Sequence, residues 1–179
     1  MKRSVLLAAG LLTITACADT DTAPPPADAA PDPLADYRPS PAREQAVVQT
    51  LQRLFDALER GDEELLRSVM DPSVVMHFSE TRDGATTFSS ATVDGLATRI
   101  TSSEVPLIER MWDPVVVVDG PLATIWTPYD FYAGTEFSHC GVDVANLMET
   151  EEGWTIVALS WTRLQPPSCE LHPDGPPSA

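Results

Sequence analysis

The chain is poor in positive charge, and Lys2 is its only lysine. Its 179 residues include 11 basic and 27 acidic side chains, which gives a formal net charge of −16 at pH 7. A surface of this sign repels nucleic acid and anionic membranes, so neither is expected as a partner. A chain that loses Lys2 with a signal peptide has no ε-amine left, which excludes Schiff-base chemistry and a lysine-containing phosphate loop.

Histidine and long apolar runs are scarce as well. The three histidines, His77, His139 and His172, fall on separate predicted elements without the spacing of metal ligands. We therefore predict neither a metal site nor a cofactor. Beyond its first residues the chain has no apolar stretch long enough for a membrane-spanning helix, and it has no internal repeat. Its length suits one domain.

The first 17 residues have the pattern of a secretion signal. Met1-Lys2-Arg3 precedes the short apolar run Val5 to Leu12. Ile14-Thr15-Ala16-Cys17 resembles the lipobox of bacterial lipoproteins, in which the cysteine becomes the lipid-bearing first residue of the mature protein. We expect residues 1–16 to be a lipoprotein signal peptide; an ordinary signal peptide cleaved nearby is the alternative. This predicts a protein of the bacterial cell envelope that contacts the membrane only through the Cys17 lipid.

The residue after the lipobox cysteine indicates which membrane holds the anchor. Ala18 occupies this position instead of aspartate, which in well-studied two-membrane bacteria would not signal retention at the inner membrane. We therefore expect anchoring in the outer membrane, with the domain facing the periplasm or the cell surface.

Proline-rich segments flank the predicted domain. Residues 17–42 contain seven prolines among alanine, aspartate and threonine, and they predict an extended, solvated tether. Residues 43–164 carry the apolar patterning of a folded domain. Residues 165–179 contain five prolines, and we expect this tail to run over the surface.

The first part of the domain is predicted to be a helical hairpin. Residues 41–60 have one apolar face, Ser40 is placed to cap their N-terminus, and Gly61 is placed to end the helix. Asp62 can cap a second, shorter helix that Asp71-Pro72 stops.

A strand and a third helix are predicted next. Val74 to Phe78 is a strand by composition, and a polar loop with a turn at Arg82-Asp83-Gly84 follows it. The apolar spacing of Val93 to Ile100 predicts a helix, for which Ser90 or Thr92 could be the cap.

The second half of the chain is predicted to be mostly sheet. The apolar run Val115 to Val118 suits a strand covered on both faces. Leu122 to Leu164 has the pattern of three consecutive strands, with tight turns at residues 133–135 and 150–153. A long bent sheet of this kind needs the upstream helices to fill its concave side.

The order of these elements is similar to that of the nuclear transport factor 2-like superfamily, in which a bent sheet wraps around helices to form a cone with a pocket. The most specific motifs are Leu58 to Asp62, Asp71 to Val75, and Glu152 to Val157. Within the superfamily, Ser138 to Asp143 and Trp126 to Tyr132 resemble the SnoaL-like and putative lumazine-binding bacterial domains. The resemblance implies an α+β domain in which a bent antiparallel sheet of four to six strands surrounds three helices.

Strand parity and the resemblance together suggest a site. His139 and Asp143 share one face of their strand, and the resemblance implies that this face lines the cone. Asp143 aligns with the oxyanion-hole aspartic acid of ketosteroid isomerase, a member of the superfamily. The positions of that enzyme's tyrosine and general base hold Leu54 and Phe78, or His77 if the register shifts by one, so we do not expect this isomerase activity.

The candidate ligand-binding residues surround the pocket that the resemblance implies; they are Leu54, Phe55, Phe78, Trp126, Tyr129, His139 and Asp143. The aromatic residues could form a stacking wall or could simply be packing residues. His139 could be a general base, or a core histidine held by Asp143 or a carbonyl. Asp143 could be a protonated hydrogen-bond donor, or a carboxylate paired with His139 or an arginine.

Two cysteines remain once Cys17 is lipidated, and in an oxidising compartment Cys140 and Cys169 are expected to pair. Cys140 points away from the face of its neighbour His139, so the imidazole cannot readily activate this thiol as a nucleophile.

Three functions stay open on this basis. The first is a lipid-anchored domain that binds a small apolar or aromatic ligand, or a protein partner, without chemistry. The second is a small proton-transfer enzyme of the isomerase or dehydratase type that uses His139 and Asp143. The third is an assembly module that forms homodimers through the outer face of the sheet.

Overall fold

The computed structural model describes residues 32–177 of the chain. Its helical segments are the short 3-10 helix η1 (Ala35–Tyr37) and the helices α1 (Pro41–Arg60), α2 (Glu63–Val69) and α3 (Val93–Ser102). Its strands are β1 (Val75–Arg82), β2 (Ala85–Thr92), β3 (Leu107–Met111), β4 (Val115–Asp119), β5 (Leu122–Ala133), β6 (Glu136–Thr150) and β7 (Gly153–Arg163). Among residues 32–177, no helix is long and apolar enough to cross a membrane. The predicted signal peptide, Cys17 and most of the predicted tether lie outside this range.

The helical hairpin forms where the sequence predicts it. Gly61 ends α1 in the left-handed conformation, with φ of 63°. The Asp62 carboxylate caps α2 by accepting a hydrogen bond from the Leu65 N–H at 2.9 Å. The predicted hydroxyl cap at Ser40 is not formed; instead the Ser40 carbonyl accepts the Glu44 N–H.

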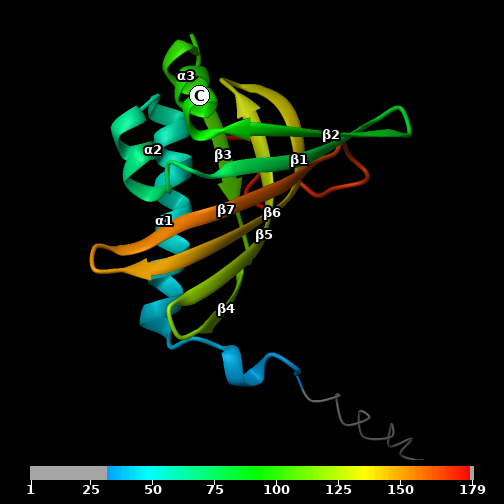
Figure 1. The fold of residues 1–179 in the computed structure, drawn as a ribbon. Helices are drawn as coiled ribbons and strands as arrows, with labels where there is room; N and C mark the ends of the chain where they lie inside the picture. Colours follow the sequence, from blue (N-terminus) through cyan, green and yellow to red (C-terminus); the bar gives the residue numbers. More distant parts are fainter. Residues whose placement is uncertain (1–31, 178–179) are drawn as a thin grey trace, which may run out of the picture. The chain divides into compact units, whose positions relative to one another are not determined.

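The sheet contains seven strands in the order β2-β1-β7-β6-β5-β3, and β4 also pairs with β5 (Figure 1). Every strand pair is antiparallel except β1 with β7, which is parallel. The predicted fold class, α+β with three helices and a bent sheet, is confirmed. The sheet is mixed and has more strands than the four to six expected, because two segments were not recognised as separate strands.

The first of these strands is β2, which the sequence indicates only as a polar loop. It pairs with β1 along its whole length, from Arg82 with Ala85 to Val75 with Thr92. Asp83 and Gly84 both have positive φ, as a two-residue hairpin turn with the right-handed strand twist requires. Most side chains of β2 are exposed, so the strand shows no alternation of apolar and polar residues.

The second is the division of the segment before β5 into β3 and β4. Asp113 has a φ of 46° and is followed by Pro114, which cannot donate to a ladder, so the segment breaks there. Both pieces pair with β5, β3 along residues 129–133 and β4 along residues 122–126.

The core lies between α1 and the concave face of the sheet (Figure 1). The buried face of α1 is the predicted apolar stripe and includes Val47, Leu51, Leu54, Phe55 and Leu58. It packs with inward-facing strand residues such as Ile125, Leu147 and Ile156, all without solvent exposure. This packing fixes the strand positions that surround the site.

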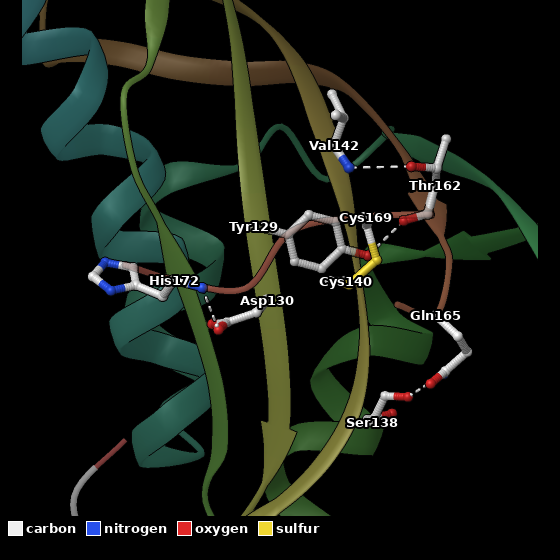
Figure 2. Close-up of a disulfide and its surroundings, with 9 residues drawn as sticks. All are labelled: Tyr129, Asp130, Ser138, Cys140, Val142, Thr162, Gln165, Cys169 and His172. Carbon is white, nitrogen blue, oxygen red and sulfur yellow. Dashed lines mark hydrogen bonds between the residues drawn. A yellow bond between two sulfur atoms is a disulfide. The ribbon is translucent and has the colours of Figure 1, made fainter. Parts of the chain in front are cut away.

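The C-terminal tail is tied to the sheet, with the predicted disulfide between Cys140 and Cys169 at its centre (Figure 2). The two Cα atoms are 5.8 Å apart. The backbone of Leu164 also pairs with that of Cys140, with an N–O distance of 2.8 Å from the Leu164 N–H. The tail therefore starts as an extension of β7 along β6 and is then closed by the disulfide.

The rest of the tail is hydrogen-bonded to a buried ion pair. Asp130 has no solvent exposure, and the Arg110 guanidinium donates to its two oxygens at 2.9 and 2.6 Å. The backbone N–H of His172 donates to the same carboxylate, and Arg110 donates to the Gly175 carbonyl. The His172 ring also contacts Trp112 edge-on. Beyond Cys169, the tail is thus held at His172 and at Gly175.

Gly141 of β6 lies close against the backbone of Thr162 in β7. The Thr162 hydroxyl accepts a hydrogen bond from the Val142 N–H, and the Thr162 carbonyl accepts one from the Tyr129 hydroxyl at 2.8 Å (Figure 2). A β-carbon at position 141 would lie 2.6 Å from the Thr162 hydroxyl oxygen and 2.9 Å from its carbonyl carbon. Only glycine leaves room for this crossing.

Candidate functional site

A cavity of about 220 Å³ lies among α1, α3 and the strands that face them. Its wall is mainly apolar with a few ionisable groups; the lining residues are Leu54, Phe55, Leu58, Met76, Phe78, Ser90, Ala91, Gly95, Leu96, Arg99, Leu107, Glu109, Phe131, His139, Asp143, Leu159, Trp161 and Arg163. An apolar cavity with a small number of convergent polar groups is the usual form of a small-molecule site.

Two aromatic rings form one side of this cavity. Phe78 of β1 and Trp161 of β7 are directly paired in the sheet, and their rings stack with centroids 4.8 Å apart and planes 13° apart. The Arg163 guanidinium lies 4.2 Å from the centroid of the Phe78 ring. A cation in this position is held by the negative face of the ring. The wall therefore combines a stacked aromatic pair with a positive charge at its side.

Two carboxyl groups meet on another part of the wall. Asp143 of β6 is 2% exposed, and the Glu109 carboxyl from β3 lies beside it on the cavity wall. Two buried carboxyl groups this close do not readily ionise together, because burial disfavours the charged form and like charges repel. Burial raises the pKa of Glu109 to about 7, and burial together with the neighbouring Glu109 raises the pKa of Asp143 well above its ordinary value. At neutral pH the pair therefore retains a proton.

His139 is neutral in this site. Burial, and then the positive charges of Arg163 and Arg99, lower the pKa of His139 to about 3. Its Nδ1 is 2.9 Å from the Ser138 hydroxyl, and its ring stacks on Phe131 with centroids 4.9 Å apart. Neither the bond from His139 to Asp143 nor an ion pair from Asp143 to an arginine is formed in the described part of the chain.

The structure brings five of the sequence-predicted ligand residues to the cavity: Leu54, Phe55, Phe78, His139 and Asp143. Their role in binding stays a prediction. The placement of Trp126 and Tyr129 in the pocket is corrected by the structure. Trp126 is 44% exposed because its parity on β5 puts it on the outer face. Tyr129 faces inward, but it is fully buried in solid packing with its hydroxyl on the Thr162 carbonyl.

Sequence reasoning missed the cavity residues Glu109, Trp161 and Arg163. A signal for them exists in strand parity. Glu109 lies between Leu107 and Met111 at alternate positions, and Arg163 follows Leu159 and Trp161 in the same way. A charged residue that continues an apolar strand face is a candidate for a buried polar site.

The protonated carboxyl pair predicts that stability falls as pH rises. The unfolded chain releases both protons near pH 4, whereas the folded pair retains a proton to about pH 7 or higher, so the loss accumulates across this range. The contribution of His139 to the unfolding free energy has the opposite sign and rises with pH. It acts only below pH 6.5, where His139 binds a proton in the unfolded chain but not in the folded one. We therefore expect unfolding free energy to fall between pH 6.5 and 8, by up to about 1.4 kcal/mol per pH unit for each proton held.

This pH dependence can be measured by denaturant unfolding of three proteins. The Glu109→Gln/Asp143→Asn double variant removes both groups and should show a flatter profile than wild type from pH 6.5 to 8. The Glu151→Gln/Glu152→Gln variant replaces two carboxyl groups in an exposed turn and should keep the wild-type slope. Equal slopes in wild type and the cavity variant would show that the pair holds no proton.

The fold and this site place the chain among the nuclear transport factor 2-like proteins. A family model described as "Putative lumazine-binding" matches residues 42–162, and the chain belongs to this family. No curated protein matches the chain.

Several solved structures have a similar fold. A nuclear transport factor 2-like protein from Salmonella enterica aligns with a TM-score of 0.56 at 14% identity, over 70% of this chain and 94% of its own. A "putative dehydratase" from the NTF2-like family of Streptomyces avermitilis aligns with a TM-score of 0.53 at 18% identity, over 70% of this chain and 99% of its own. A "putative aromatic ring hydroxylase" from Novosphingobium aromaticivorans aligns with a TM-score of 0.55 at 14% identity, over 72% of this chain and 94% of its own. At these identities the likeness shows the fold alone.

Proposed function

We propose that this protein binds a small planar ring compound in the cavity between α1, α3 and the sheet, while a lipid on Cys17 anchors it in the cell envelope. The observation that carries the binding proposal is the stacked pair Phe78 and Trp161 on the wall of a cavity of about 220 Å³. A buried apolar cavity of about 150 Å³ accommodates benzene. The present cavity therefore has room for one substituted ring or a small fused pair.

The family description supports a ligand of this shape. Lumazine is a flat two-ring molecule with N–H donors and carbonyl acceptors, which suits an aromatic wall beside carboxyl and guanidinium groups. These polar groups would fix the orientation of the ring, and the apolar wall would supply most of the binding free energy.

The proposal predicts saturable binding of lumazine that depends on the wall. Calorimetric titration of the full chain with lumazine measures the dissociation constant. For Trp161→Leu this constant should be at least tenfold higher than for wild type, because an aromatic surface that contacts the ring is removed. Trp126→Leu makes the same change on the outer face and should leave the constant unchanged. Absence of saturable binding, or an equal loss in both variants, would contradict the proposal.

A second candidate is proton-transfer catalysis, favoured specifically by the carboxyl pair Glu109 and Asp143. A buried carboxyl group that stays protonated at neutral pH can donate to a developing oxyanion, and its partner can accept a proton. Of the two catalytic residues expected from the sequence, His139 and Asp143, His139 is a weak base because its pKa is lowered, so Asp143 with Glu109 is the better candidate. Deuterium exchange into cyclohexanone in D₂O, followed by NMR, should be faster with wild type than with Asp143→Asn; equal rates would leave binding as the function.

The anchoring proposal predicts a change of cell fraction. Cys17→Ser should move the protein from the membrane fraction to the soluble envelope fraction, because two or three acyl chains bury enough methylenes for stable attachment. Detergent-phase partitioning of both forms measures this, with Cys169→Ser as a cysteine variant that should stay with the membrane. If Cys17→Ser remains in the detergent phase, the lipid is elsewhere or absent.

A further inference from the structure

Two buried polar atoms on the cavity wall are without ordinary partners in the described chain. Asp143 Oδ2 receives no hydrogen bond from an N–H or O–H group of residues 32–177, and Arg163 Nε finds no acceptor there. An unsatisfied buried group destabilises the folded state, and more so when it is charged, so these atoms point to what a ligand would supply.

The two atoms require opposite partners. Arg163 Nε needs an acceptor and Asp143 Oδ2 needs a donor. Asp143 is paired directly with Trp161 in the sheet, and Arg163 lies two residues beyond Trp161 on the same face. Diagonal neighbours of this kind are about 7–8 Å apart at the backbone, a span that one substituted ring can bridge. The stacked Phe78 and Trp161 rings lie alongside this span.

The charges of the wall indicate the nature of the acceptor. Arg99 from α3 and Arg163 from β7 place two guanidinium groups on the wall, and the buried Nε of Arg163 has no acceptor among residues 32–177. An anionic group on the ligand would supply this acceptor and pair with the positive charge of the guanidinium.

We propose that the ligand is a planar aromatic acid with a second, hydrogen-donating substituent: its anionic group pairs with Arg163 Nε and its O–H or N–H donates to Asp143 Oδ2. This inference rests on the proposed ring-binding function and specifies the polar groups of the ring. Arg99 contributes charge from the helix side of the cavity. The ring lies against Phe78 and Trp161.

The test compares four single-ring probes with the full wild-type chain: 4-hydroxybenzoate has both groups, 4-fluorobenzoate lacks the donor, 4-hydroxybenzamide lacks the charge, and fluorobenzene lacks both. Calorimetry should give 4-hydroxybenzoate a dissociation constant at least tenfold lower than that of either probe with one group. Equal constants for these three probes would overturn the inference and leave ring binding intact. Saturable binding of lumazine with none of the four probes would overturn it too, whereas failure of lumazine and all probes would contradict the proposed function itself.

Two variants assign the groups. Arg163→Met should abolish the preference for 4-hydroxybenzoate over 4-hydroxybenzamide, and Asp143→Leu should abolish its preference over 4-fluorobenzoate. Arg82→Met, at the exposed tip of β1, is the matched arginine control and should change neither ratio. Unchanged ratios in the folded cavity variants would overturn the assignment. Because the probe series uses wild type, a variant that fails to fold leaves the inference testable.

Discussion

Gly141→Ala is expected to destabilise the domain by about 3 kcal/mol or more, as severe overpacking does. The added methyl group would overlap the backbone carbonyl of Thr162 and would lie 2.6 Å from its hydroxyl oxygen. Backbone cannot rotate away as a side chain can, so β7 would have to shift away from β6. That shift would also break the hydrogen bonds of the Thr162 carbonyl with Tyr129 and of its hydroxyl with Val142. Denaturant unfolding would measure the loss.

Two comparisons identify the cause. Gly141→Ala/Thr162→Gly removes the hydroxyl but leaves the carbonyl, so it should not restore stability. Gly95→Ala is a control in α3, where the new β-carbon meets only the Thr92 hydroxyl at 3.3 Å and alanine favours the helix. A Gly141→Ala protein as stable as Gly95→Ala would show that the two strands can separate at this point without loss.

Arg110→Met should destabilise the domain by about 3–5 kcal/mol, because it leaves the Asp130 carboxylate buried without its counter-charge. Asp130 has no solvent exposure, and the remaining donor is the backbone N–H of His172. The same change removes the bond from Arg110 to the Gly175 carbonyl. The tail should therefore become more accessible, which limited proteolysis would detect beside the unfolding measurement.

The double variant Arg110→Met/Asp130→Leu should recover at least half of this loss, since a buried ion pair can often be replaced by apolar groups at little cost. Arg82→Met breaks an exposed ion pair with Glu80 and should cost less than about 1 kcal/mol. If Arg110→Met behaves like Arg82→Met, the buried pair contributes little to the fold.

Much of the fold could be predicted because its longest elements have strong local patterns. The apolar stripe of α1 ends at Gly61, and the turns at residues 133–135 and 150–153 divide β5, β6 and β7 as the sequence indicates. Strand β2 could not be predicted in this way, because an exposed edge strand needs no apolar alternation. The parallel pairing of β1 with β7 depends on contacts between distant segments, which local patterns do not record.

The site could be predicted only in part, for a similar reason. Parity placed His139 and Asp143 on one face of a single strand, and the structure has both on the cavity wall. The partner of Asp143 is Glu109 on β3, and which distant side chain would reach it depends on how the sheet curves. The charge state of His139 could not be predicted from the sequence either, because it depends on burial and on two arginines that come from α3 and β7.

The position of β7 has a consequence for the order of assembly. This strand is the last in sequence order among the described strands, yet it lies between β1 and β6 in the sheet. An isolated hairpin such as β1–β2 is marginally stable in water, so it can join the sheet only after residues 153–163 have been synthesised. Contacts between such distant segments also make folding slow. In the envelope location that we propose, a chain that crossed the membrane from its N-terminus would deliver β1 and β2 before β7, and the sheet could close only after β7 had followed.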